Sequence, residues 1–133
     1  MIYLGGNSIS KIFIIDDDKD IVLLFEQSLK LKGHEIVAKA FNGEETLKTY
    51  KGFQNAPDII LMDHRMPVKN GIEVTKEILT INPKCKIIFI NANYSVRDKA
   101  LETGATDFLE KPIEFESLFR MIEKHQTPKP NIF

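Results

Sequence analysis

The sequence has little of several features that would mark particular classes of protein. Among its 133 residues is one cysteine, which excludes an internal disulfide framework. Lysine plus arginine number 18 and aspartate plus glutamate 19, so no basic excess indicates nucleic acid or an anionic membrane as a direct partner. No apolar run approaches a membrane span of ~20 residues, and the start of the chain lacks a signal-peptide pattern. Together these absences favour a reducing, cytoplasmic compartment.

The composition is that of a globular domain. Apolar residues make up 43% of the chain and charged residues 28%, which excludes intrinsic disorder. A chain of this length corresponds to about one domain. We therefore expect one domain over residues 11–126, with an N-terminal extension at 1–10 and a C-terminal tail at 127–133.

Short apolar runs alternate along the chain with segments that have a helical period. The runs are at 11–16, 34–40, 58–63, 86–91 and 106–109, and the helical patterns lie at 21–29, 44–51, 74–81, 96–101 and 115–122. Strands that are apolar throughout need cover on both faces, which indicates a parallel sheet flanked by helices. Right-handed crossovers then predict an α/β fold with a doubly wound five-stranded parallel sheet flanked by five helices. We take 2-1-3-4-5 as the strand order, in which the first and third strands are neighbours.

Polar side chains gather where the expected strands end. Asp16 and Asp17 end the first strand, Asp63 the third and Asn91 the fourth, while Lys111 follows the fifth. Ligands of a doubly wound sheet bind at the carboxyl ends of its strands, so we expect the three aspartates to share one pocket. Close carboxylates repel each other, and oxygen ligands without histidine or cysteine suit Mg²⁺. With a lysine opposite, such a pocket is typical of a phosphoryl site in which one carboxylate acts as nucleophile.

Each of these residues taken alone has a simpler role. An aspartate between a strand and a helix most often caps the helix. A single loop lysine is most often solvated, and an asparagine at a strand end is often a turn residue. The combination of these side chains at one edge of the sheet is what favours the phosphoryl site.

Three segments together resemble a known family. They read IFIIDDDKDI at 12–21, DIILMDHRMPVKNG at 58–71 and GATDFLEKP at 104–112. In this order and spacing they resemble the receiver domain of two-component response regulators, in its single-domain, chemotaxis-regulator-like form. The resemblance covers about residues 11–126 and implies a flavodoxin-like fold.

The resemblance implies a role for each matching position. Asp63 matches the aspartate that accepts a phosphoryl group from a sensor histidine kinase or phosphotransfer protein. Asp17 matches the acid that ligates Mg²⁺ directly, and Asp16 its partner, often through water. Arg65 matches the position whose backbone carbonyl completes the metal site. Lys111 matches the lysine that contacts a phosphoryl oxygen, so the implied chemistry is self-catalysed phosphotransfer and hydrolysis rather than turnover by an enzyme.

The resemblance also implies a switch, with one departure from the family pattern. Phe108 matches the aromatic that turns inward on activation, and the Lys111–Pro112 bond matches a cis peptide. Asn91 stands where the family usually has threonine or serine, so the usual coupling of a hydroxyl to the aromatic is altered. The expected output is the surface of helix four, strand five and helix five, acting on an unknown downstream protein. Pairing of two copies through this surface stays open.

Three other functions stay open. Asp16 and Asp18 resemble the nucleophile motif of Mg²⁺-dependent phosphatases of the haloacid dehalogenase type, in which Asp16 would carry the phosphoryl group. That family's later paired-aspartate motif is missing. A flavodoxin-like electron carrier shares the sheet order, but three aspartates would repel a flavin phosphate. A receiver-like scaffold that is never phosphorylated is favoured by Asn91 and opposed by the intact acidic set.

The histidines and the cysteine are expected to have no part in the chemistry. His64 is expected to lie in a solvated loop, since no partner triad is visible in the sequence. His34 and His125 are expected at the surface. Cys85 is expected to be an inert structural thiol.

Overall fold

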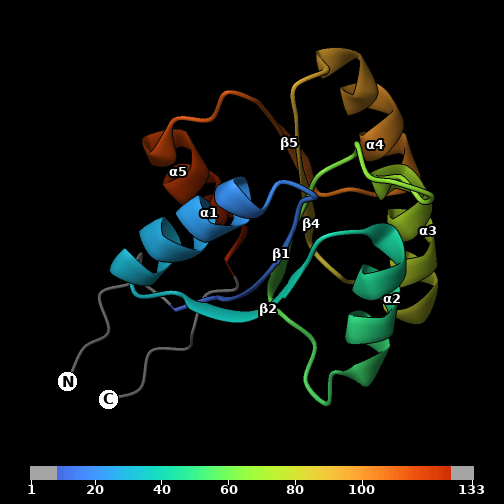
Figure 1. Ribbon diagram of the computed structural model, residues 1–133, viewed down its shortest axis with the longest axis horizontal. Coiled ribbons are helices and arrows are strands. Elements are labelled where there is room, and N and C mark those ends of the chain that lie inside the picture. Colours follow the sequence, from blue (N-terminus) through green and yellow to red (C-terminus); the bar gives the residue numbers. More distant parts are fainter. Residues whose placement is uncertain (1–8, 127–133) are drawn as a thin grey trace.

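Five apolar segments form one parallel sheet in the computed structural model, which describes residues 9–126 (Figure 1). They are β1 (Lys11–Ile15), β2 (Glu35–Ala40), β3 (Ile59–Met62), β4 (Ile87–Asn91) and β5 (Asp107–Glu110). The strands lie in the order β2-β1-β3-β4-β5, and every neighbouring pair is parallel. The order predicted from the sequence is therefore confirmed.

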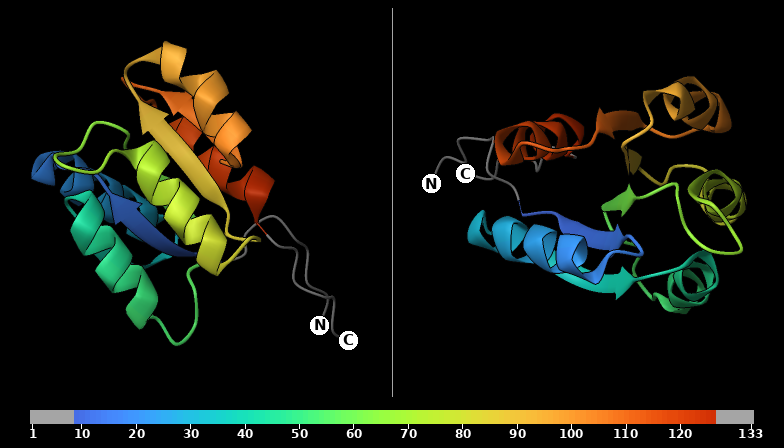
Figure 2. Two further views of the ribbon diagram at one scale, coloured as in Figure 1. Left: turned by 90° about the vertical axis from the view of Figure 1, so that its right-hand side faces the viewer. Right: turned by 45° about the horizontal axis from the view of Figure 1, so that its top comes forward.

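The helices cover both faces of this sheet. They are α1 (Lys19–Leu31), α2 (Gly43–Gly52), α3 (Gly71–Ile81), α4 (Arg97–Thr103) and α5 (Phe115–His125), with the short 3₁₀ helix η1 (Tyr94–Val96) before α4. Figures 1 and 2 show α1 and α5 on one face and α2, α3 and α4 on the other. Within the described part of the chain, no helix has the length and apolar character needed to cross a membrane.

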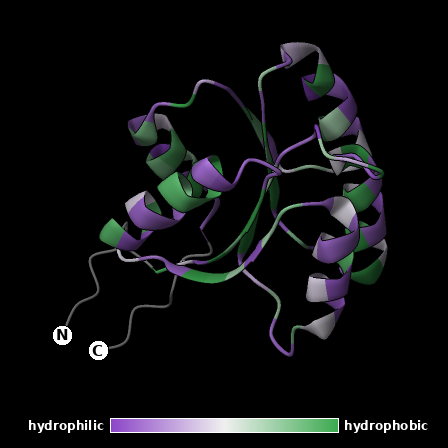
Figure 3. Ribbon diagram, in the orientation of Figure 1, coloured by the Kyte–Doolittle hydropathy of each residue, from purple (hydrophilic) through white to green (hydrophobic). Residues whose placement is uncertain are grey.

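Two apolar cores lie on either side of the sheet because successive strand residues point to opposite faces. In β1, Phe13 and Ile15 pack in the core beneath α2, α3 and α4, and Ile12 and Ile14 pack in the core beneath α1 and α5. Figure 3 shows hydrophobic residues along the strands and a mixture of hydrophobic and hydrophilic residues along the helices. Burial on both faces explains why the strands read as unbroken apolar runs.

Polar residues set the helix starts beside the carboxyl ends of the strands. Asp18 caps α1, where its side chain accepts from the backbone N–H groups of Asp20 and Ile21. Asn70 begins α3 with a capping box that Glu73 completes. These caps set the residue at which α1 and α3 begin, and therefore the length of the loops that join them to the strands before them.

Several boundaries differ from the predicted ones by about one residue. β1 ends at Ile15 and β3 at Met62, so Asp16 and Asp63 lie just beyond the strands and face the edge of the sheet. β5 runs one residue further than expected, to Glu110. The weak fourth helix is split into η1 and α4, and Gly104 ends α4 with a φ of 120°, a conformation that glycine adopts without strain.

At the amino ends of the strands, polar groups are paired with one another. The backbone N–H of Ser10 donates to Nδ1 of His34 over 3.1 Å, and Gln126 Nε2 donates to Ser10 Oγ over 3.0 Å. His125 Nε2 lies 2.8 Å from the Asp107 carboxylate. His34 is buried and His125 half-buried, so the expectation that both lie at the surface was wrong. The sheet brings these residues together from distant parts of the chain, and no local pattern marks them.

Candidate functional site

The predicted site residues meet at the carboxyl ends of β1, β3, β4 and β5. The backbone N–H of Asp63 donates to the carbonyl of Ile15, which places the first residue after β3 beside the end of β1. The backbone N–H of Lys111 donates to the Asn91 carbonyl over 2.9 Å and joins the ends of β4 and β5 in the same way. The sheet itself therefore sets the spacing of the site.

Three carboxylates converge at this edge. Each of Asp16, Asp17 and Asp63 offers an oxygen atom, and these atoms lie within 4.8 Å of one another. Asp16 and Asp63 are buried, whereas Asp17 is exposed. A set of three carboxylates that is open to water on one side fits a hard divalent cation such as Mg²⁺, which keeps part of its water shell.

Lys111 supplies the positive charge of the pocket. Its Nζ lies 2.8 Å from Asp16 Oδ2 and 3.5 Å from Asp63 Oδ1. Burial alone would lower the pKa of Lys111, but the hydrogen bond to Asp16 and the charge of Asp63 outweigh it and hold this pKa above its usual value. The ammonium group therefore stays charged at physiological pH and bridges the two buried carboxylates.

The surroundings of Asp63 disfavour the charged form of its carboxylate. Burial and the charge of Asp16 raise its pKa to about 6, and Lys111 offsets only part of this rise. A carboxylate whose charged form is stabilised so little by its surroundings gains from the binding of a nearby cation.

Asp16 is already committed to other partners. Its Oδ1 accepts from the backbone N–H of Asp18 over 2.9 Å, and its Oδ2 is held by Lys111. The Asp63 carboxylate meets Lys111 over the longer distance of 3.5 Å. This geometry favours Asp63 over Asp16 as a nucleophile and disfavours the phosphatase alternative.

The loop after β3 carries Arg65 and ends against the backbone of Asp63. A Cβ atom built on Gly71 would lie 2.6 Å from the Asp63 carbonyl oxygen, so only glycine fits at this point. Arg65 is exposed on this loop, two residues after Asp63. His64 is half-buried and its Nδ1 is buried without a hydrogen-bond partner, which differs from the expected solvated side chain. The burial follows from packing of its ring against Phe89, which sequence spacing does not reveal.

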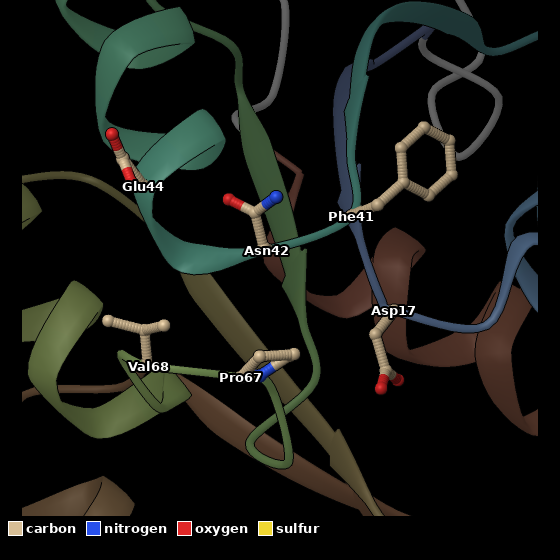
Figure 4. A pocket seen from close by; sticks show the side chains of 6 residues that line it. All are labelled: Asp17, Phe41, Asn42, Glu44, Pro67 and Val68. Atoms are coloured by element: carbon tan, nitrogen blue, oxygen red, sulfur yellow. The ribbon is translucent and has the colours of Figure 1, made fainter.

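A cavity of about 400 Å³ opens beside Asp17 (Figure 4). It is lined by Phe41, Asn42, Glu44, Pro67 and Val68 together with Asp17. Val68 has a φ of 66° and is almost fully exposed, a conformation that is rare for a β-branched residue. The cavity gives solvent and small ions a route to Asp17.

A second, apolar groove borders the site on the other side. It has a volume of about 410 Å³ and is lined by apolar side chains of α1 and of the segment that follows β5. The lining includes Leu24, Ile113 and Phe115, and Lys111 also lines it. The Lys111–Pro112 peptide bond between β5 and this segment is cis, as the resemblance implied.

Asn91 and Phe108, the residues expected to form the switch, both lie inside the fold. Asn91 is buried, and its side-chain amide reaches the Asn93 carbonyl over 3.4 Å. Phe108 points into the core beneath α2, α3 and α4, and its neighbour across the strands is Phe89. Its ring also meets Tyr94, a contact that the sequence pattern did not reveal.

Comparison with known proteins agrees with the fold and the pocket. The family model described as response regulator receiver domain matches residues 12–123. The chemotaxis protein CheY of Thermotoga maritima is 33% identical over 116 residues, which span 86% of this chain and 95% of that protein.

Two solved structures of bound complexes are also similar. The response regulator TrrA from Thermotoga maritima, in complex with Mg²⁺ and BeF, is 30% identical with a TM-score of 0.80, over 89% of this chain and all of that chain (100%). The CheX–CheY–BeF₃–Mg²⁺ complex from Borrelia burgdorferi is 26% identical with a TM-score of 0.81, over 89% of this chain and 90% of that chain. With its sheet order, its acidic pocket and these relatives in agreement, the chain belongs to the response regulator receiver family.

Proposed function

We propose that Asp63 accepts a phosphoryl group from a phosphohistidine of a sensor histidine kinase or phosphotransfer protein. The observation that carries this proposal is the position of Asp63, a buried carboxylate that faces the acid pair and Lys111. The similarity to TrrA, solved in complex with Mg²⁺ and BeF, supports the proposal. The same arrangement disfavours a receiver-like scaffold without phosphorylation, since such a scaffold has no need of three clustered carboxylates.

Asp16, Asp17 and Asp63 are the side chains that would hold Mg²⁺, together with the backbone carbonyl of Arg65. The clustered carboxylate oxygens fit such an ion, and exposed Asp17 leaves room for its waters. When bound, the ion neutralises charge on the phosphoryl oxygens. The Arg65 contribution follows from the resemblance, and its place on the loop directly after Asp63 is compatible with it.

The chain's own residues carry the transfer. A carboxylate oxygen of Asp63 attacks phosphorus as the phosphorus–nitrogen bond of the donor breaks, and the bonding electron pair stays on the imidazole nitrogen. The product is an acyl phosphate on Asp63. Lys111 pairs with one phosphoryl oxygen, and the Asn91 amide is the donor available for another. Hydrolysis returns the protein to its unphosphorylated form. Water attacks the phosphorus, and inorganic phosphate and the Asp63 carboxylate are released.

The apolar groove beside Lys111 is the surface that we assign to the phosphodonor protein. The donor histidine must come within bonding distance of Asp63, and this groove is continuous with the pocket through Lys111. Leu24 is about half exposed on α1, and Phe115, the first residue of α5, lines the same groove. An apolar side of a donor helix suits this lining, because its contact removes both apolar surfaces from water.

The output surface that we propose is formed by α4, β5 and α5, and it acts by docking on a downstream protein. Phe108 lies on the strand of this surface and connects it to the site. The complex of a relative with CheX shows that a CheY protein of this fold binds another protein directly.

We place this activity in the cytoplasm, with residues 11–126 as the receiver domain, 1–10 as an extension and 127–133 as a tail. Pairing of two copies is tested by the mass of the protein in solution with and without a phosphoryl mimic.

Mass spectrometry after incubation with Mg²⁺ and a small phosphodonor tests the phosphoacceptor. We expect one added phosphoryl group on the wild type and none on Asp63→Asn. Asp58→Asn is the matched control, since Asp58 stands at the opposite end of β3 and accepts from the backbone N–H of Lys11. An unchanged mass gain in Asp63→Asn would assign the phosphoryl group to another residue and overturn the proposal.

Thermal unfolding in the presence of Mg²⁺ tests the metal site separately. A ligand that binds only the folded state raises its stability by mass action. We expect the midpoint to rise with Mg²⁺ in the wild type and to respond much less in Asp17→Asn. Equal responses in both proteins would place the ion elsewhere.

A further inference from the structure

One ring contact joins the loop beyond the phosphoryl site to the switch aromatic. The rings of Tyr94 and Phe108 have centroids 5.7 Å apart and planes at 85°, an edge-to-face arrangement. Tyr94 is 56% exposed and Phe108 only 7%. Tyr94 therefore covers Phe108 towards the solvent, in a geometry that aromatic pairs favour beyond the area they bury.

The position of Tyr94 is fixed by its own turn. The Oδ1 atom of Asn93 accepts from the backbone N–H of Ser95 over 3.0 Å and from Ser95 Oγ over 2.6 Å, and so encloses Tyr94 between two bonded residues. The Arg97 guanidinium also lies over the ring, 5.9 Å from the Tyr94 centroid. The turn therefore fixes the backbone of Tyr94, and its ring contacts both Phe108 and Arg97.

The same turn is bonded to the phosphoryl site. The Asn91 carbonyl accepts from the backbone N–H of Lys111, and the Asn91 side-chain amide reaches the Asn93 carbonyl. A shift of Lys111 or Asn91 towards a phosphoryl oxygen therefore acts on a turn that holds Tyr94 three residues later. Neither Asn91 nor Phe108 carries the hydroxyl group through which the family's usual switch pair acts.

We propose that Tyr94 is the positioning residue that couples the phosphoryl site to Phe108 in this chain. The inference rests on the proposed function, because it takes Asp63 as the residue that carries the phosphoryl group. The edge-to-face contact stabilises the buried position of Phe108. The phosphoryl group, held by Lys111 and Asn91, stabilises the position of the turn that makes this contact. By linkage, each of the two then strengthens the other.

The test compares Tyr94→Ala with Tyr94→Phe, which keeps the ring and its contact. Calorimetric titration with beryllofluoride and Mg²⁺ measures the affinity for a phosphoryl mimic. We expect Tyr94→Ala to weaken this affinity about three- to tenfold, as the loss of one aromatic pair predicts. Tyr94→Phe should stay within about twofold of the wild type, since most of the pair's energy comes from the ring.

A second aromatic pair provides the control for a merely structural effect. Phe53 meets Tyr50 edge-to-face at 6.0 Å, at the end of α2 and outside the loop that follows β4. Phe53→Leu should lower thermal stability without changing the affinity for beryllofluoride. In the ligand-free protein, ¹H–¹³C spectra of the Phe108 ring should change in Tyr94→Ala and stay close to the wild type in the other two variants.

The outcomes separate the inference from the proposed function. If the wild type binds beryllofluoride and Tyr94→Ala binds it equally well, Tyr94 is only a cover for Phe108 and the inference fails alone. If Phe53→Leu weakens binding as much as Tyr94→Ala, the effect is one of stability and the inference also fails. A wild type that binds no beryllofluoride at all contradicts the phosphoacceptor as well as the coupling.

Discussion

The carboxyl ends of the strands (the carboxyl edge) and their amino ends (the amino edge) shift the pKa of an aspartate in opposite directions. At the carboxyl edge, Lys111 serves two buried carboxylates at once, and the pKa of Asp63 rises to about 6 through burial and the nearby charge of Asp16. At the amino edge, burial alone would raise the pKa of Asp107, but hydrogen bonds from the His125 side chain and the Phe108 backbone lower it. The charged form of Asp63 therefore destabilises the folded state, whereas the charged form of Asp107 stabilises it.

The fold is less stable at the carboxyl edge, where the candidate reactive carboxylates lie, than it would be with paired charges there. At the amino edge, Ser10 pairs with His34 and Asp107 with His125. The carboxyl edge gathers three carboxylates whose like charges a bound divalent cation would neutralise. Strain at functional sites is tolerated when the rest of the structure compensates for it.

Removal of the lysine should produce the largest effect. Lys111→Met leaves two buried carboxylates without their positive partner, so we expect the free energy of unfolding at pH 7.5 without metal to fall by about 3 kcal/mol. The loss should shrink as the pH is lowered towards 5, because the carboxylates then take up protons. Denaturant unfolding at the two pH values measures both. An equal loss at both pH values would show that Lys111 acts through packing rather than charge.

Asp63→Asn should stabilise the protein where the charge of Asp63 is costly. The folded-state pKa of about 6 lies above the unfolded value of 3.8, so the wild type loses stability as the pH rises from about 4 to about 6. At pH 7.5 without metal we expect the variant to be more stable by roughly 2 to 3 kcal/mol, since the folded and unfolded pKa values differ by about two units and one unit corresponds to about 1.4 kcal/mol. Urea unfolding across this pH range provides the measurement. A variant that is less stable than the wild type at every pH would contradict the raised pKa.

The same substitution at Asp107 should have the opposite sign and a smaller size. The lowered pKa of Asp107 means that its charged form contributes stability above the unfolded value of 3.8, and that this stability is lost as the pH falls through the folded value. Asp107→Asn should therefore cost about 1 kcal/mol at pH 7.5, the size of one hydrogen bond between these groups. The cost should vanish near pH 2. If both aspartate substitutions stabilised the protein, the contrast between the edges would be wrong.

The sequence predicted the parts of the molecule that local pattern determines. Unbroken apolar strands and helical stripes are local signals, and they were sufficient for a doubly wound parallel sheet. The sheet order and the meeting of Asp16, Asp17, Asp63 and Lys111 are not local, and their prediction also relied on the resemblance of three segments to the family. The contact between Tyr94 and Phe108 is not local, because it depends on how a turn after β4 lies over β5. His34 is the clearest failure, since its burial arises from Ser10 and from the end of α5, far away in the chain.

The hydrogen bond between Gln126 and Ser10 makes this domain suitable as an insertable module. Because side chains near the two ends of the domain meet, with Gln126 Nε2 3.0 Å from Ser10 Oγ, the receiver could interrupt a surface loop of a host protein without moving the loop's ends far apart. The same proximity would allow a short linker to close the fold, with new ends opened in the exposed stretch at 54–56 between α2 and β3. Both rearrangements join the chain at the amino edge, so the phosphoryl site at the opposite edge would be carried into the new protein with its geometry intact.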